Sequence, residues 1–113
     1  MKRIALLPLA LAAFAASAHH GWSEYDSSKP MKVTGRILES GYEHPHGFVR
    51  LEAPGKTWRV VLAPPSRMEF RGLTKQLLKP GGSATVEGYQ NRGAPEEMRA
   101  ERITIDGKTV ELR

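Results

Sequence analysis

Hydrophobic and polar residues alternate along much of the chain after Met31, and this alternation predicts β-strands. The first run places Val33, Gly35 and Ile37 on one face, with charged or polar residues between them. A period of two is the pattern of a strand that buries one face. Similar runs predict further strands over residues 47–52, 57–62, 84–89, 98–105 and 108–112. The chain is therefore expected to form a mostly β domain.

The breaks between these runs predict turns and one short helix. Residues 53–56 and the pair Asp106-Gly107 have the composition of tight turns between strands. The segment from Ser66 to Glu69 follows two prolines and matches a capping box, in which Ser66 caps the amide of residue 69. It predicts a short helix that stops near Gly72.

The order of elements is three strands, a short helix and then two or three strands. This order fits a small Greek-key barrel with its helix between the third and fourth strands, and we expect an OB-type barrel. An open β-sandwich is the alternative. Gly35 and Gly88 lie inside predicted strands, where a tightly coiled barrel needs bends. Simple tolerance of glycine at weak strand positions would give the same pattern.

The N-terminus has the three parts of a secretory signal peptide. Lys2 and Arg3 precede an apolar run over residues 4–14, and Ala16-Ser17-Ala18 forms a small-x-small cleavage site. The run is shorter than the ~20 residues that a membrane span needs. We therefore predict a signal peptide at 1–18, an N-terminal arm at 19–30 and a β-barrel domain at 31–113. The processed protein would be periplasmic or secreted, without stable membrane insertion; a retained anchor helix is the alternative.

Composition narrows the chemistry further. The chain has no cysteine, which excludes disulfides, thiolate metal sites and a cysteine-anchored lipoprotein. The formal net charge is +5, but basic and acidic residues are interleaved, as in Arg99-Ala100-Glu101-Arg102. We interpret this pattern as a solvated surface and expect no nucleic-acid partner, because a polyanion groove needs clustered bases.

All four histidines occur in two tight groups, His19-His20 and His44-Pro45-His46. Cleavage after Ala18 would make His19 the first residue of the mature protein. Its α-amine has an ordinary pKa near 7.7–8.0, so a metal ion can displace the remaining proton at neutral pH at little cost. The amine and the imidazole of this one residue can then chelate a metal together.

The second group lies in the loop before the second strand. Proline fixes its own φ and favours an extended conformation for the residue before it, so His44 and His46 are expected to present both imidazoles on one side. One of these imidazoles would complete a T-shaped array of three nitrogen ligands with His19, an arrangement called a histidine brace. Nitrogen ligands of this kind favour copper, and Cu(II) leads the divalent affinity order.

Other interpretations of the histidines stay open. Glu24, Asp26 or Glu43 could orient a ligand imidazole through a hydrogen bond. The first group could also be only a solvated terminus, and the second only a polar turn. A histidine that changes charge with pH is a further alternative.

Several short motifs together resemble a known family. They are Ala18-His19-His20, Tyr25-Asp26, His44-Pro45-His46 and the stretch from Leu78 to Gly88. In this order and spacing, the chain resembles a family of small secreted bacterial proteins of unknown function. Its members open the mature chain with Ala-His-His and carry an Asn-Pro-His motif after the first strand. The resemblance implies a site of His19, His20 and His46, with His44 as an additional group, since asparagine is usual there.

We therefore expect a periplasmic metal-binding module for which copper is the favoured metal and His19, His20, His44 and His46 are the candidate ligands. An envelope protein that exchanges metal with it is a further candidate partner. The alternative is a non-metal OB-type domain that binds a ligand or protein through an exposed face of aromatic and basic residues: Tyr42, Phe48, Arg50, Arg59 and Tyr89. An oxidative copper enzyme is a third hypothesis, but we do not expect an enzyme, because about 95 residues leave little scaffold for a shaped pocket.

Overall fold

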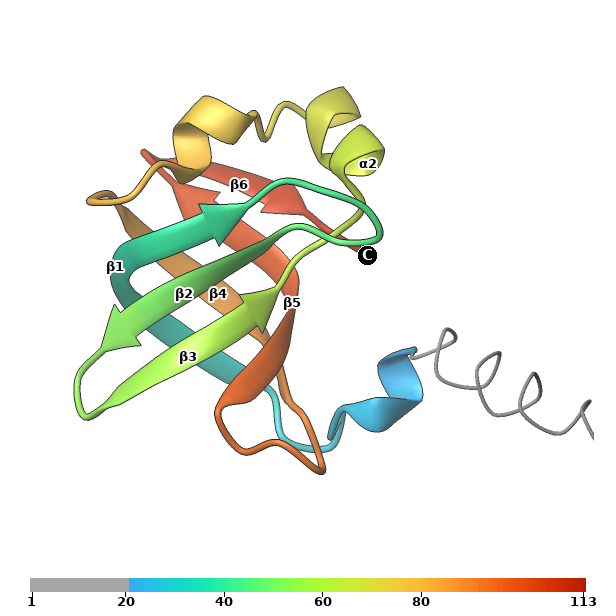
Figure 1. The fold of residues 1–113 in the computed structure, drawn as a ribbon. Helices are drawn as coiled ribbons and strands as arrows, with labels where there is room; N and C mark the ends of the chain where they lie inside the picture. Colours follow the sequence, from blue (N-terminus) through green and yellow to red (C-terminus); the bar gives the residue numbers. More distant parts are fainter. Residues whose placement is uncertain (1–20) are drawn as a thin grey trace, which may run out of the picture.

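The computed structural model describes residues 21–113 (Figure 1). The predicted signal peptide, its cleavage site and the pair His19-His20 lie outside the described residues. The strands are β1 (Met31–Gly41), β2 (Phe48–Ala53), β3 (Lys56–Val61), β4 (Ser83–Gln90), β5 (Glu97–Ile105) and β6 (Lys108–Glu111). The helical elements are the 3-10 helix η1 (Trp22–Glu24), the α-helix α2 (Pro65–Phe70) and the 3-10 helix η2 (Lys75–Leu78).

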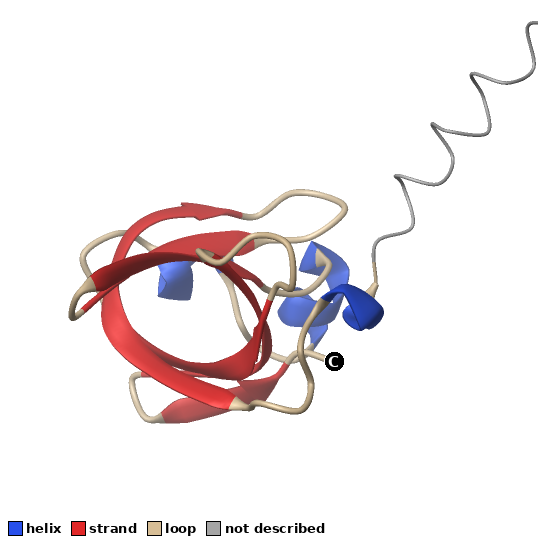
Figure 2. Ribbon diagram, turned by 90° about the horizontal axis from the view of Figure 1, so that it is seen from below, coloured by secondary structure: helices blue, strands red, loops and turns tan. Residues whose placement is uncertain are grey.

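The strands close into a barrel, which Figure 2 shows end-on. β1, β2 and β3 form an antiparallel meander, and β4 pairs with the other edge of β1. β5 pairs antiparallel with β4 and parallel with β3, which closes a ring of five strands. β6 extends the sheet from β5 as a hairpin. This Greek-key order, with α2 between β3 and β4, is that of an OB-type barrel, so the predicted fold is confirmed and the open sandwich is excluded.

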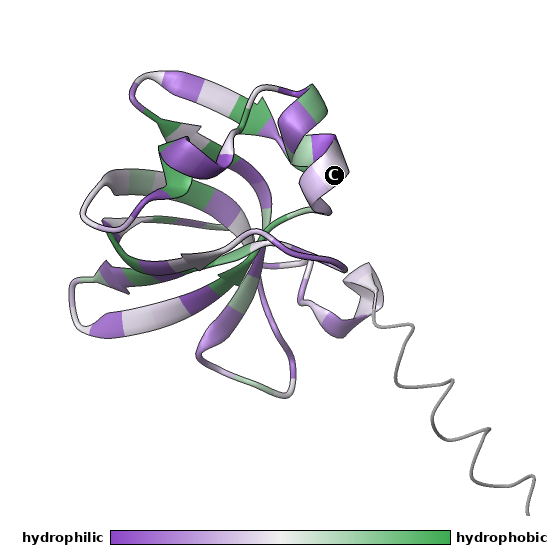
Figure 3. Cartoon of the chain, turned by 45° about the horizontal axis from the view of Figure 1, so that its top comes forward, coloured by the Kyte–Doolittle hydropathy of each residue, from purple (hydrophilic) through white to green (hydrophobic). Residues whose placement is uncertain are grey.

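The core lies inside the barrel and beneath its helical end. Side chains at alternate strand positions are buried, including Ile37, Val49, Leu51, Val60, Val86, Met98 and Ile103. Met68, Leu73 and Leu78, from α2 and the segment after it, are also fully buried against this cluster. Figure 3 shows the resulting alternation of hydrophobic and hydrophilic positions along the strands. The chain thus buries a continuous core without a disulfide.

Two strand glycines permit close backbone approach, as the sequence predicts. A Cβ atom on Gly35 would lie 2.3 Å from the carbonyl oxygen of Glu52. A Cβ on Gly88 would lie 2.0 Å from the carbonyl oxygen of Arg99, next to an irregularity in the β4–β5 register. Both distances are far inside van der Waals contact, so these positions need glycine for the barrel to coil tightly.

The start of α2 differs from the predicted capping box. The N-cap residue is Pro64, the helix begins at Pro65, and no side chain caps it. Proline is well suited to the first helical position, because its φ is already helical and it lacks an amide hydrogen. Ser66 therefore lies one residue inside the helix, where its hydroxyl cannot cap the first turn.

The turn between β5 and β6 is confirmed. Asp106 and Gly107 both adopt positive φ, 52° and 77°, as a two-residue hairpin loop requires. No helix among residues 21–113 is long and apolar enough to cross a membrane.

Candidate functional site

The His-Pro-His segment forms the loop between β1 and β2, and the two histidines have different surroundings. Hydrogen bonds from the Gly47 amide to the Ala63 carbonyl and from the Leu62 amide to the Gly47 carbonyl hold the end of the loop against the segment that follows β3. The His44–Pro45 peptide bond is cis. His44 is exposed, whereas His46 is half-buried.

His46 contacts a buried arginine. Its Nε2 atom lies 3.3 Å from Nη2 of Arg99. A guanidinium group only donates hydrogen bonds, so the Nε2 atom of His46 is the acceptor and carries the lone pair. Burial, followed by the positive charges of Arg99 and Arg67, lowers the pKa of His46. Its imidazole is therefore neutral at pH 7, which is the form that binds metals.

Arg99 lies on the outer side of β5, between Met98 and Ala100, which point into the core. It is nevertheless only 8% exposed. The interpretation of residues 99–102 as solvated surface is therefore wrong for Arg99. It holds for Arg102, which forms partly exposed ion pairs with Glu87 and Glu111.

Trp22, from η1 in the N-terminal arm, covers Arg99. The guanidinium carbon of Arg99 lies 4.3 Å from the Trp22 ring centroid, and that of Arg113 lies 4.4 Å from the same ring. Tyr25 and Tyr89 meet the ring edge-to-face at centroid distances of 6.4 and 6.2 Å. Figure 2 shows η1 beside the C-terminus, in agreement with the contact to Arg113. These contacts hold the arm against the barrel.

Tyr25 provides the second anchor of the arm. Its hydroxyl donates a hydrogen bond to Oε2 of Glu97 over 2.6 Å, and its backbone forms an isolated β-bridge with Asn91. Burial, strengthened by the hydrogen bond to Glu97, raises the pKa of Tyr25 to about 12. The Asp26 amide donates to the Gln90 carbonyl, and the Arg92 amide donates to the Glu24 carbonyl. The arm is thus tied to the loop between β4 and β5 by its backbone as well.

The carboxylates considered as orienting groups are engaged elsewhere or exposed. Asp26 accepts hydrogen bonds from the amide and hydroxyl of Ser28, which lower its pKa. Glu43 and Glu24 are both exposed. Within residues 21–113 no three His, Asp or Glu side chains come together closely enough to hold a metal. A metal site at His46 would therefore need ligands from before residue 21.

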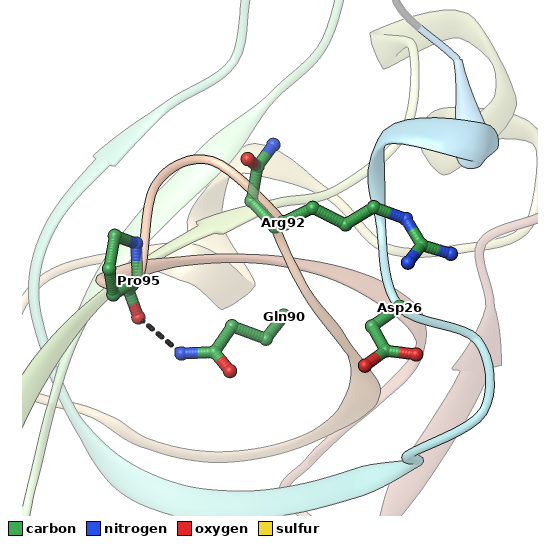
Figure 4. Close-up of a pocket in the computed structure, with 5 residues that line it drawn as sticks. Asp26, Gln90, Arg92 and Pro95 are labelled. Atoms are coloured by element: carbon green, nitrogen blue, oxygen red, sulfur yellow. Dashed lines mark hydrogen bonds between the residues drawn. The ribbon is translucent and has the colours of Figure 1, made fainter.

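A shallow polar hollow of about 330 Å³ lies between the arm and the β4–β5 loop (Figure 4). Its lining comprises Asp26, Gln90, Asn91, Arg92 and Pro95. The side-chain amide of Gln90 donates to the Pro95 carbonyl over 2.8 Å, which closes one side of the hollow. Neither His44 nor His46 contributes to it.

The residues of the alternative binding face divide into two groups. The Tyr42 and Tyr89 hydroxyls are used internally, by the Leu73 carbonyl and by Glu101 respectively. Phe48 and Arg59 lie on the outer face of β2 and β3, with the guanidinium carbon 4.2 Å from the phenyl ring. Arg50 lies opposite Arg59 in the strand register, and its Nε atom donates a hydrogen bond to Oε1 of Glu39 over 2.9 Å. Of the five predicted residues, Phe48, Arg50 and Arg59 are the ones available as an exposed surface.

Residues 6–99, which are most of the chain, match the model of one protein family. The chain belongs to a family of unknown function, DUF6152. The match confirms the expected membership in an uncharacterised family. No curated protein sequence matches the chain significantly.

Solved structures support the fold alone. A chain of the S. pombe Stn1–Ten1 complex superposes with a TM-score of 0.54 at 18% identity, over 67% of this chain and 57% of that one. TiaS without its ZRD, in complex with agmatine, matches with a TM-score of 0.52 at 22% identity, over 78% of this chain and 25% of that one. TiaS in complex with tRNA and ATP matches with a TM-score of 0.52 at 23% identity, over 79% and 20%. The chain spans 57% of the first of these proteins and a quarter or less of the other two, so the likeness concerns the fold of one part of each.

Proposed function

We propose that the protein is a metal-binding module of the bacterial envelope that takes copper through His19 and His46, assisted by His20 or His44. The observation that carries the proposal is the position of Trp22. Trp22 contacts Arg99, and Arg99 contacts His46, so the arm begins its described course beside the half-buried imidazole.

Chain geometry supports the pairing of the two histidines. His19 lies three residues before Trp22, and three extended residues span at most roughly 10–11 Å. The contacts from Trp22 to Arg99 and from Arg99 to His46 measure 4.3 and 3.3 Å. The two contacts together are shorter than this span, so we expect the amine of His19 to reach His46 while the Trp22 contact is kept.

The donor set fits copper. A neutral imidazole and an N-terminal amine are nitrogen ligands, which suit Cu(II) better than the hard cations Ca²⁺ or Mg²⁺. His46 is kept neutral by its surroundings, so no proton has to leave the ring before a metal binds. Arg99 must yield its hydrogen bond if the metal uses Nε2, and its positive charge lowers the affinity for a cation.

The proposed location follows from the same residues. A signal peptide cut after Ala18 would deliver the protein to the periplasm or the medium and expose His19 as the first residue. Mass spectrometry of the mature protein from the native host tests this step directly. A mature chain that starts anywhere except His19 removes the amine ligand from the site.

Calorimetric titration of Cu(II) into protein that starts at His19 tests the binding itself. We expect nanomolar or tighter affinity. One additional residue before His19, or His46→Ala, should weaken it by more than roughly 100-fold, because each removes a direct ligand and not only an orienting contact. His44→Ala is the matched control from the same loop and should have a smaller effect. Unchanged affinity after extension of the N-terminus would exclude the amine.

A second candidate function is a non-metal binding module, and the stack of Arg59 on Phe48 favours it. The outer face of strands 2 and 3 is where OB-type barrels bind oligosaccharides and oligonucleotides. Calorimetry of metal-free protein with envelope oligosaccharides tests this function. A signal that disappears in Arg59→Gln and survives in His46→Ala would support it over the metal proposal.

A further inference from the structure

Three arginines from separate elements converge around Trp22 and His46. Arg67 comes from α2, Arg99 from β5 and Arg113 from the end of the sequence. Arg99 and Arg113 share the Trp22 ring. Arg67 lies close enough to lower the pKa of both His46 and Arg99. Like charges held this close repel one another, so a negative charge placed among them would be stabilised.

The described residues supply only part of that charge. Glu101 lies 3.6 Å from Arg113, but within residues 21–113 no carboxylate pairs with Arg67 or Arg99. Arg67 donates to the Leu112 carbonyl, and Arg99 to His46.

Arg99 also has an unused donor. Its Nε atom is buried and has no hydrogen-bond partner in the structure. A buried N–H without an acceptor costs ~1–3 kcal/mol, and more when the group is charged. Such a donor, beside two other cations, marks a position where an acceptor with negative charge would be stabilised.

We propose that this cluster of Arg67, Arg99 and Arg113, next to Trp22, binds a small oxyanion of carboxylate or phosphate chemistry. Guanidinium groups match the paired oxygens of such anions, and charge-assisted hydrogen bonds of this kind are about twice as strong as neutral ones. Arg67 is half-buried and Arg113 exposed, so a ligand can reach these two arginines from solvent. The inference does not depend on the metal proposal, because it uses none of the predicted metal ligands.

The test uses the protein that starts at His19, cleared of metals on a chelating resin, because soluble chelators are themselves carboxylates. Inorganic phosphate and malonate are titrated separately, with tryptophan fluorescence as the readout. Trp22 touches two of the arginines, whereas Trp58 is buried in the core and serves as a constant background. We expect a saturable change with at least one anion, absent in Trp22→Phe, and no such change with chloride at equal ionic strength.

Substitutions assign the response to the cluster. Arg67→Gln should weaken the anion by about tenfold or more, equivalent to ~1.4 kcal/mol. Arg36→Gln removes a similar charge from β1 and should leave the affinity unchanged. Thermal unfolding of both variants shows whether they are folded, and Arg113→Gln serves as the second cluster variant if Arg67→Gln is not.

Two results would overturn the proposal: a response to phosphate and malonate no larger than that to chloride, or equal anion affinity in wild type and both cluster variants. A direct measurement of Cu(II) affinity separates this failure from failure of the metal function. Anion binding without copper binding would leave only the oxyanion site, and copper binding without anion binding would leave only the metal site.

Discussion

Arg99 shows how one outward position on a strand connects the arm, the loop and the barrel. Its guanidinium contacts Trp22 on one side and His46 on the other. Cation–aromatic contacts contribute ~0.5–1 kcal/mol when exposed and ~2 kcal/mol or more when desolvated. With Arg99 only 8% exposed, the stronger case applies. Sequence alternation correctly places this residue outside the barrel but gives no sign that the arm covers it.

Tyr25 predicts a loss of stability in alkali. Its pKa is raised from an ordinary value near 10 to about 12 in the folded protein, so folding favours the neutral phenol. The stabilisation is complete below pH 10 and disappears as pH rises through 12. Each pKa unit corresponds to ~1.4 kcal/mol, which limits the loss to about 3 kcal/mol. Urea unfolding between pH 8 and about 11.5 measures it.

Tyr25→Phe is the control for this pH dependence, because it keeps the buried ring and removes the ionisable hydroxyl. The variant should lack the part of the alkaline destabilisation that belongs to Tyr25, while the other tyrosines and the lysines still titrate. Parallel curves for wild type and Tyr25→Phe from pH 9 upward would contradict the assignment.

At the scale of elements, the β4–β5 pair contains Gly88, the described glycine whose surroundings leave the least room for a Cβ atom. Gly88→Ala would place a methyl group 2.0 Å from the Arg99 carbonyl oxygen, and both partners are backbone in a paired strand. We expect destabilisation at or above the ~1–3 kcal/mol typical of overpacking. Gly82→Ala is the control, since its nearest contact would be an ordinary 3.7 Å. Equal midpoints of denaturation for the two variants would show that the strands separate easily.

The start of α2 leads to the opposite kind of prediction, a substitution with little effect. A true serine cap contributes ~1 kcal/mol, but no side chain caps α2 and Ser66 is exposed. Ser66→Ala should therefore change the free energy of unfolding by less than about 0.5 kcal/mol. Chemical denaturation measures this change. A loss near 1 kcal/mol would show that Ser66 does cap the helix, as the capping-box prediction has it.

For the whole molecule, local patterns predict the elements and long-range contacts complete them. Alternating residues and turn signals are sufficient for the strands, because each strand buries one face. Their order and the helix between the third and fourth suggest the barrel. The parallel pairing of β3 with β5, which closes it, joins segments far apart in sequence. No local pattern in either strand specifies that pairing.

For the candidate site too, local sequence patterns predict some features, whereas long-range contacts are needed for others. The histidine groups are visible in the sequence, and the aromatic residues of the arm indicate that it is held against the barrel. The link between them depends on Arg99 and Arg113, whose charges resemble those of any solvated surface until the fold stacks them on Trp22. A tryptophan so close to a proposed metal-binding terminus is the one sequence signal that points to this link.

The coupling between the arm and the barrel predicts how copper affects the whole protein. If His19 and His46 bind one ion, the metal joins the arm to the β1–β2 loop and stabilises only the folded state. Copper at about 100 times its dissociation constant would then add ~2.7 kcal/mol. For a domain of this size, this raises the unfolding temperature by roughly 10–20 °C. Trp22→Ala should reduce the increase by freeing the arm and lowering the effective concentration of His19 at His46, while Trp22→Phe, which retains a stacking ring, should keep most of it. An equal increase in all three proteins would show that Trp22 does not position His19 at His46, and no increase in any of them would show that copper binds to the terminus alone, without the barrel.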